Sequence, residues 1–296
     1  MHKRNMMQEN SQALESKQRQ IVNMFDEIAK DYDKANRILS LGIDISWRVD
    51  ATKRALNALE STSALSVLDV ACGSGDMILH WQKRLRALNG AQNAYQKIIG
   101  IDPSKEMLKA AHQKIPESRL INVATNAGGM DFNGTDSGAK NLDSNNADSS
   151  ASTSPNTAPI SLMLGEAKDL SAIESSSIDI VSIAYGLRNV LSYELALSEF
   201  ARVLKKGGVL VVLDFFKKSK PSLLDKIIGL YTKRVLPIVG GLISRNFAAY
   251  KYLPDSMEVF VTPEELKAAL EKVGIQTKEI RSYSAGISHL VLGVKG

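Results

Sequence analysis

The sequence predicts an α/β fold in which a mostly parallel sheet of seven strands carries helices on both faces. Short runs rich in Val, Ile and Leu alternate with longer stretches of helical character, which is typical of parallel strands joined by helices. The first run, at 67–70, ends in the turn Gly73-Ser74-Gly75 before a helical stretch that begins at Met77. We expect the last strand to run antiparallel to the others.

Seven apolar runs are candidate strands. They lie at 67–70, 98–101, 160–164, 178–184, 209–215, 276–282 and 287–294. No internal repeat is visible. With 296 residues and a hydrophobic fraction of 44%, the chain can form one large domain, which we place at 21–296.

The N-terminal part divides into two stretches. Residues 1–20 are polar, and we expect them to be flexible. From Ile21 onward apolar residues return at helical spacing, so that Met24, Phe25 and Ile28 share a face. This periodicity predicts helices ahead of the sheet.

Residues 124–159 interrupt the α/β pattern. They are rich in Ser, Asn, Asp, Thr, Gly and Ala and contain few large apolar side chains. Such a stretch cannot bury enough surface to offset its ordering entropy. We therefore expect a disordered insertion that loops out before the third strand.

Composition excludes few classes of protein. The single cysteine, Cys72, cannot form an internal disulfide, which suits a reducing compartment such as the cytoplasm. The longest apolar run, at 235–243, contains a proline and two glycines and is too short to cross a bilayer. The net charge of +5 permits attraction to anionic membranes or to nucleic acid without choosing between them.

The glycine turn predicts a ligand. Ligands of open α/β sheets bind where parallel strands end, and small residues there let the backbone approach them. Asp102 ends the second strand, where a carboxylate can accept both hydroxyls of a ribose. Ile78 stands where a dinucleotide motif needs its third glycine, and no phosphate-binding Walker motif is present. Together, the glycine turn and Asp102 indicate an adenosine-containing cofactor. The alternative is a glycine turn in an ordinary α/β protein.

The stretch from Asp69 to Asp76 resembles the first motif of class I S-adenosylmethionine (SAM) methyltransferases. The resemblance implies a Rossmann-like sheet and SAM as cofactor, held by Asp69, Gly73, Ser74, Gly75 and Asp102. It also implies that the loop after the third strand contacts the adenine through Glu166 or Ala167. A solvated acidic loop residue is the alternative for Glu166.

Further blocks are similar to the ubiquinone/menaquinone biosynthesis C-methyltransferase family. They are Tyr-Asp-Lys-Ala-Asn at 32–36, Trp47-Arg48, Tyr-Gly-Leu-Arg-Asn-Val at 185–190 and the lysine–glycine–glycine turn at 205–208. The resemblance runs from about Val22 to the C-terminus, without the insertion. It implies methylation of a ring carbon in a reduced quinone with a prenyl tail, most simply demethylmenaquinol and alternatively a ubiquinone precursor.

The resemblance also suggests catalytic residues. The ring carbon becomes nucleophilic when the neighbouring hydroxyl loses its proton, so the reaction needs a proton acceptor and a group that stabilises the phenolate. We expect Arg188 to stabilise that charge, Asn189 to orient a hydroxyl or water, and Asp33 to accept the proton. Tyr32 and Tyr185 are candidates for substrate contact, with Tyr32 in a helical lid. No cluster has metal-ligand spacing, so we expect no metal.

Residues 217–260 form a second insertion, which mixes apolar side chains with lysines and arginines. We interpret it as a lid that encloses a prenyl tail or touches a membrane surface, at the inner face of the cytoplasmic membrane. A homodimer contact and ordinary core packing are the alternatives.

Three other functions are alternatives to quinol methylation. A nucleic-acid amino methyltransferase needs an N/D-P-P-aromatic loop, but this chain has Ala184-Tyr185-Gly186-Leu187, and Cys72 lies in the wrong place for a cytosine enzyme. We therefore expect no nucleic-acid partner. A methyltransferase for another small molecule and a non-catalytic SAM-binding subunit remain open.

Overall fold

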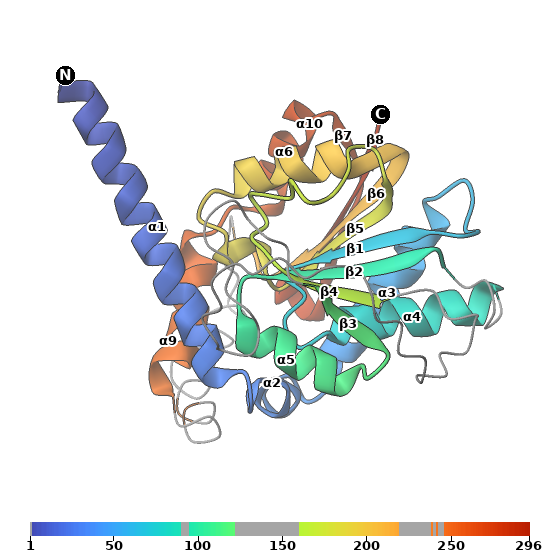
Figure 1. Ribbon diagram of the computed structural model, residues 1–296, viewed down its shortest axis with the longest axis horizontal. Coiled ribbons are helices and arrows are strands. Elements are labelled where there is room, and N and C mark those ends of the chain that lie inside the picture. Colours follow the sequence, from blue (N-terminus) through green and yellow to red (C-terminus); the bar gives the residue numbers. More distant parts are fainter. Residues whose placement is uncertain (1, 90–94, 122–159, 219–237, 239–240, 242–245) are drawn as a thin grey trace, which may run out of the picture.

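The computed structural model describes residues 2–89, 95–121, 160–218, 238, 241 and 246–296. Its centre is an eight-stranded sheet with the order β3-β4-β2-β1-β5-β6-β8-β7 (Figure 1). The strands are β1 (Ser66–Val70), β2 (Lys97–Asp102), β3 (Ser118–Ile121), β4 (Ile160–Leu164), β5 (Ile178–Ala184), β6 (Leu204–Asp214), β7 (Ile275–Tyr283) and β8 (Ser288–Lys295). Neighbours from β3 to β6 pair in parallel, whereas β8 is antiparallel to both β6 and β7. The predicted α/β sheet with an antiparallel last strand is confirmed.

The eighth strand, β3, is the one that the sequence did not reveal. It has four residues, lies at the edge of the sheet and pairs with β4 alone. Its side chains include Ser118 and Arg119, and an edge strand this short and polar carries no continuous apolar run.

Helices cover both faces of the sheet (Figure 1). On one face lie α3 (Ile43–Asn57), α4 (Asp76–Asn89) and α5 (Lys105–Lys114); on the other lie α6 (Tyr193–Val203) and α10 (Pro263–Lys272). Because successive side chains of a strand point to opposite faces, Val67 of β1 packs with the first group and Leu68 with the second. These two buried layers fix the orientation of every strand end.

Two further helices precede the sheet. Helix α1 (His2–Ile28) runs out beyond the body of the molecule, and α2 (Tyr32–Ser40) follows it (Figure 1). Residues 2–20, which we expected to be flexible, are therefore helical. They lack an apolar stripe, but Gln, Glu, Lys, Arg and Met have high intrinsic helix propensity. The lower part of α1 packs with α2, Met107 of α5 and Ala249 of α9 (Phe247–Val259), which places the predicted helical lid.

The insertion at 124–159 and most of the stretch at 217–260 lie outside the described residues, so the predictions made for them stay predictions. Of the second stretch the structure describes mainly α9, which packs beside α1. None of the helices in the described ranges has the length and apolar character needed to cross a bilayer.

Candidate active site

Two cavities adjoin where the parallel strands end. The first has a volume of about 320 Å³ and the second about 380 Å³. Phe25, Tyr32 and Tyr185 line both cavities, so the cavities adjoin at these three side chains. Ligands in the two cavities can therefore meet at this junction.

The first cavity is lined by the loops that follow four strands. Its lining includes Gly73 after β1, Asp102 and Ser104 at the end of β2, Glu166 and Ala167 after β4, and Ala184, Gly186 and Asn189 after β5. Helix α1 forms the opposite wall through Leu14, Gln18, Ile21 and Val22. This cavity contains most of the predicted cofactor residues.

Gly73 gives the cavity an open backbone wall. Its φ is +53°, a conformation that favours glycine, and a Cβ added there would meet nothing within 4 Å. Gly75 differs, because a Cβ at that position would lie 2.9 Å from Cδ1 of Ile115. The glycine at 75 is therefore required for packing against α5 rather than for ligand contact.

Asp102 joins two of these loops. One carboxylate oxygen accepts a hydrogen bond from the Gly73 N–H at 2.8 Å, and the other accepts one from the Ser104 N–H at 2.8 Å. Burial raises the pKa of Asp102 to about 6, while these two hydrogen bonds oppose the rise. Asp102 thus lines the cavity as a fixed, buried acceptor.

Asp69 and Ser74 do not reach this cavity. Asp69 is buried in the middle of the sheet, where one carboxylate oxygen accepts from Ser182 Oγ at 2.6 Å, and burial raises its pKa to about 7. Ser74 turns toward the lid, donating to Asp33 and accepting from Lys114 Nζ at 3.2 Å. The structure therefore does not support direct cofactor contact by either side chain.

Glu166 and Ala167 line the first cavity, as the adenine loop prediction requires. Ala167 is buried, whereas the Glu166 side chain is 43% exposed and pairs with Lys168 at 3.0 Å. The Glu166 carboxylate is thus partly solvated. The buried Ala167 is the more enclosed of the two predicted adenine contacts.

The second cavity has mostly apolar walls. These are supplied by Met24, Phe25, Ile28, Leu39, Leu41, Ile43, Trp47, Phe215, Ala249, Leu253, Met257 and Ile287. Two arginines, Arg48 and Arg188, also line it. A cavity of this kind suits an apolar ligand that carries or develops negative charge.

Arg188 is held rigidly at this cavity. Its Nη1 donates to Asp214 Oδ1 at 2.7 Å and to the Tyr185 carbonyl oxygen, and its side chain is only 7% exposed. Its Nε has no hydrogen-bond partner among the described residues. The guanidinium group therefore keeps hydrogen-bonding capacity that the protein itself does not use.

Arg48 is a residue that sequence reasoning left without a role. Its guanidinium lies 4.8 Å from the centre of the Tyr185 ring and within ion-pair distance of Asp44 and Asp76. Burial raises the pKa of Tyr32, and both Arg188 and Arg48 oppose that rise. Both cations are thus near the Tyr32 hydroxyl. The sequence feature that could have revealed Arg48 is a charged residue among the buried positions of α3, next to Trp47 and three residues before Ala51.

Asn189 and its neighbours in the loop after β5 are hydrogen-bonded to helices α1 and α9. This residue ends the short helix η1 (Leu187–Asn189), and its Oδ1 accepts from the Tyr252 hydroxyl of α9 at 3.1 Å. Gln18 of α1 donates to the Asn189 carbonyl oxygen and accepts from the Leu191 N–H, both at 3.1 Å. Sequence reasoning missed Gln18 because no periodic pattern marks that part of the chain.

Tyr185 adopts an unusual backbone conformation at the same loop. Its φ is +61°, which is rare for a residue with a large side chain, and its ring packs 4.9 Å from the ring of Phe215. Backbone strain of this kind is found at functional sites. Tyr185 lines both cavities, and the contact with substrate that the sequence suggests for it stays a prediction.

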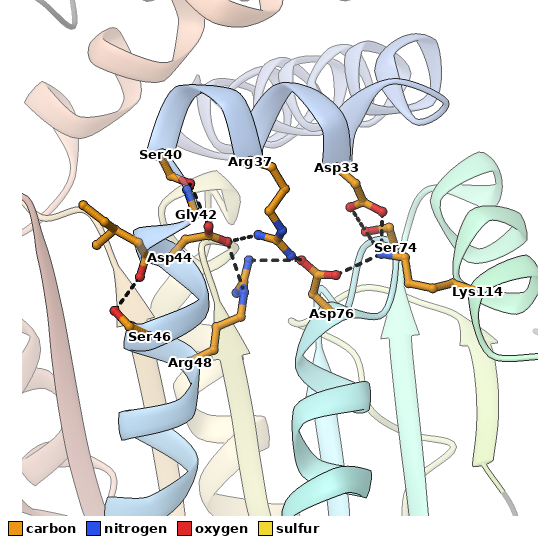
Figure 2. Close-up of polar contacts among 11 residues, drawn as sticks. Asp33, Arg37, Ser40, Gly42, Asp44, Ser46, Arg48, Ser74, Asp76 and Lys114 are labelled. Carbon is orange, nitrogen blue, oxygen red and sulfur yellow. Dashed lines mark hydrogen bonds and ion pairs between the residues drawn. The ribbon is translucent and has the colours of Figure 1, made fainter.

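Asp33, predicted as a proton acceptor, lines neither cavity. It pairs with Lys114 of α5 and accepts from Ser74 (Figure 2). The structure does not bring Asp33 to either cavity, and its role as a proton acceptor stays a prediction. The sequence placed Asp33 on the lid, but only the packing of α2 decides that this side chain faces α5.

Asp33 belongs to a group of ion pairs that we call the lid network, comprising Asp33, Arg37, Asp44, Arg48, Asp76 and Lys114 (Figure 2). Arg37 lies between Asp44 and Asp76, and Lys114 reaches Asp76 at 2.9 Å. Burial alone would raise the pKa of Asp76. Lys114, Arg48 and Arg37 together outweigh burial and hold that pKa below its usual range. The network fastens α2 to α3, α4 and α5.

The fold and the first cavity together define a class of protein. The structure resembles a chain in the complex of the Haloferax volcanii Trm112 methyltransferase activator with a methyltransferase, with a TM-score of 0.54 at 16% identity over 91% of this chain and 96% of that one. It also resembles a SAM-dependent methyltransferase from Thermotoga maritima, with a TM-score of 0.51 at 16% identity over 93% and 100%. The protein has the class I methyltransferase fold.

Sequence similarity is more specific. A Campylobacter jejuni protein named ubiquinone/menaquinone biosynthesis C-methyltransferase is 39% identical over 94% of this chain and 99% of its own length. A Thermus thermophilus protein named demethylmenaquinone methyltransferase is 35% identical over 90% and 98%. The model of the ubiE/COQ5 methyltransferase family matches residues 13–145 and 142–295. This chain belongs to that family.

The cofactor is therefore S-adenosylmethionine, and the first cavity fits it. Gly73 leaves open space beside its backbone, and Asp102 presents a buried carboxylate at the strand end where a ribose is expected. Glu166 and Ala167 stand at the far side of the same cavity. Of the seven residues predicted to hold the cofactor, the structure brings these four to the cavity.

Proposed function

We propose that this protein methylates a ring carbon of a prenylated quinol, with demethylmenaquinol as acceptor and menaquinol as product. The observation that carries the proposal is Arg188, a fixed guanidinium group at an apolar cavity that adjoins the cofactor cavity. The names of the Campylobacter jejuni and Thermus thermophilus relatives support the substrate class. The menaquinone branch is favoured because the second name specifies it.

The chain's own residues suit each requirement of this reaction. When bound, SAM supplies an electrophilic methyl group. Gly73 and Asp102 hold the nucleoside, and Tyr32 and Tyr185 form the boundary at which the two ligands meet. Arg188 and Arg48 stabilise negative charge on the acceptor oxygen, in a cavity where low polarity strengthens that attraction. Asn189 lines the first cavity beside the junction and is oriented by the Tyr252 hydroxyl, so that it holds a water that passes the acceptor's proton to solvent.

The second cavity accounts for an acceptor with a long apolar tail. Apolar side chains make up most of its lining, and Arg48 and Arg188 are among its polar members. A prenylated quinol is a membrane lipid, so the proposal includes transient contact with a membrane surface. The homodimer contact that the sequence suggests stays a prediction.

The test is methyl transfer by the purified protein. We expect mass spectrometry to show menaquinol from SAM and reduced demethylmenaquinol, and less product from the ubiquinone precursor. Deletion of the gene should leave demethylated quinone in the cell. Failure to methylate any quinol, together with methylation of RNA or of another phenol, would refute the proposal.

A further inference from the structure

Large apolar side chains are exposed where α2 turns into α3. We call residues 38–49 the α2–α3 tip. Leu41 is 84% exposed, and Ile38, Ile43, Ile45 and Val49 are each between 40% and 44% exposed. A cluster of this kind on one turn differs from the single apolar residues that are normal on a protein surface.

The tip has a fixed shape. Leu41 has a φ of 52° and Gly42 a φ of 74°, so a leucine occupies a backbone conformation that suits glycine or asparagine. Ser40 Oγ accepts from the Gly42 N–H at 3.1 Å and donates to Asp44 at 2.7 Å, and Asp44 is held in turn by Arg37 (Figure 2). The lid network thus holds the turn that presents Leu41 to solvent.

The tip is continuous with the second cavity. Leu41 and Ile43 line that cavity and are also exposed at the surface. Two tip residues therefore belong both to the exposed apolar surface and to the lining of the second cavity.

Two exposed lysines lie about one helical turn from apolar residues of the tip. Lys34 is exposed four residues before Ile38, and Lys53 is exposed four residues after Val49, so each lysine shares a helix face with an apolar tip residue. Four residues of helix span about 6 Å, so each lysine lies about one turn from an apolar tip residue on its own helix.

The acidic residues of the same helices do not cancel this charge. Asp33 pairs with Lys114, Asp44 with Arg37, and Asp50 with Arg54. Among the described residues, Lys34 and Lys53 have no acidic partner within ion-pair distance. The outer surface of the tip therefore combines apolar side chains with flanking positive charge.

We propose that the α2–α3 tip docks on an anionic phospholipid surface, with its apolar side chains in the acyl region and Lys34 and Lys53 at the head groups. The second cavity then opens toward the bilayer. This last part rests on the proposed function, since only a lipid acceptor needs such an opening; the docking itself does not.

The first test is flotation with vesicles of phosphatidylglycerol and phosphatidylcholine. The variant Ile38→Ser/Ile45→Ser/Val49→Ser changes tip residues that line neither cavity. We expect its bound fraction to fall by about tenfold, because apolar area drives interfacial binding. The control Leu88→Ser/Val259→Ser changes side chains that are 52% and 83% exposed elsewhere, and it should bind like the wild type. Equal binding by the tip variant and this control would overturn the proposal.

The second test concerns charge. Lys34→Glu/Lys53→Glu should lose binding to the anionic vesicles, whereas Lys83→Glu, an exposed lysine on α4, should not. Binding of the wild type should weaken with salt and with the removal of phosphatidylglycerol. Binding that is independent of lipid charge would contradict the role of the lysines.

Activity separates this proposal from the function. The triple tip variant should keep wild-type turnover on a short-chain quinol in solution and lose it on a long-chain quinol in vesicles. If the wild type methylates no quinol but tip variants still lose vesicle binding, the docking stands and the proposed function fails. If tip variants change sedimentation of the protein but not vesicle binding, the tip is a protein contact and the proposal is overturned. Matching melting temperatures confirm folding.

Discussion

Arg188 is the residue on which the proposed chemistry depends most. Arg188→Ala should lower kcat by about 100-fold to 1000-fold with little change in SAM affinity, because the charge that it stabilises develops only on the acceptor. Arg188→Lys should recover activity only in part, since an ammonium can replace the two hydrogen bonds that Nη1 makes but lacks the remaining N–H groups of the guanidinium. Steady-state kinetics and calorimetry measure the two effects.

A control is needed because Asp214 is fully buried beside Arg188. Loss of the arginine alone leaves an uncompensated buried carboxylate, which costs about 3–5 kcal/mol of stability. The double variant Arg188→Ala/Asp214→Asn should regain stability without regaining turnover. Full recovery of turnover in the double variant would show that Arg188 acts only through folding.

Asp102 predicts how cofactor binding depends on pH. Its pKa is raised to about 6 by burial, so the carboxylate is protonated below that value and loses acceptor capacity for the ribose hydroxyls. SAM affinity should therefore hold steady from about pH 8 to pH 7 and fall as the pH drops through 6. Asp102→Asn should bind SAM about 10-fold to 100-fold more weakly, with little pH dependence.

Calorimetry across this pH range provides the test. Asp69→Asn is the matched control, because burial also raises the pKa of Asp69 but the residue lies outside the cavity. The control should keep the loss of affinity near pH 6. If Asp69→Asn instead abolished the loss of SAM affinity near pH 6, the titrating group would be Asp69 in the interior of the sheet and not Asp102.

At the scale of elements, the lid network determines how firmly α2 is held. Lys114→Met removes ion pairs to Asp33 and Asp76 and should speed hydrogen exchange in α2 and SAM dissociation, at a cost of about 1 kcal/mol in stability. Lys109→Met, on the same helix, breaks an exposed pair with Glu106 and should change neither rate. Equal exchange in the two variants would mean that packing alone holds α2.

Helix α1 contributes to the site through Gln18. Gln18→Leu removes both hydrogen bonds to the loop that carries Asn189 and should lower kcat/KM by about 5-fold to 30-fold, given the usual worth of two such bonds. Gln20→Leu changes an exposed glutamine on the same helix and should have no effect. Wild-type kinetics in Gln18→Leu would exclude a positioning role for α1.

At the scale of the whole molecule, the sheet was predictable because its central strands are buried on both faces. Runs such as 178–184 are mostly apolar, with Asp179 and Ser182 as their polar residues, so their apolar signal is strong. The short edge strand β3 and the polar helix α1 carry no such signal. Gly73 and Asp102 were found because strand ends in this fold meet at one edge, which a sequence pattern can reveal.

The rest of the site depends on how distant elements pack. The residues Asp33 and Ser74 have side chains suited to a ligand, but α2 directs them toward each other and Lys114. Gln18 and Arg48 reach the cavities from helices whose docking angle no local pattern specifies. Tertiary packing therefore decided which of the polar candidates became site residues.

The two adjoining cavities have a consequence for the order of events in turnover. Helix α1 lines both cavities, whereas residues of the α2–α3 tip line the second alone. Under the proposed function, an acceptor that enters along the tip does not pass through the cofactor cavity, so neither ligand has to bind first. We expect random-order initial-rate kinetics, and several rounds of methyl transfer before the protein changes vesicles.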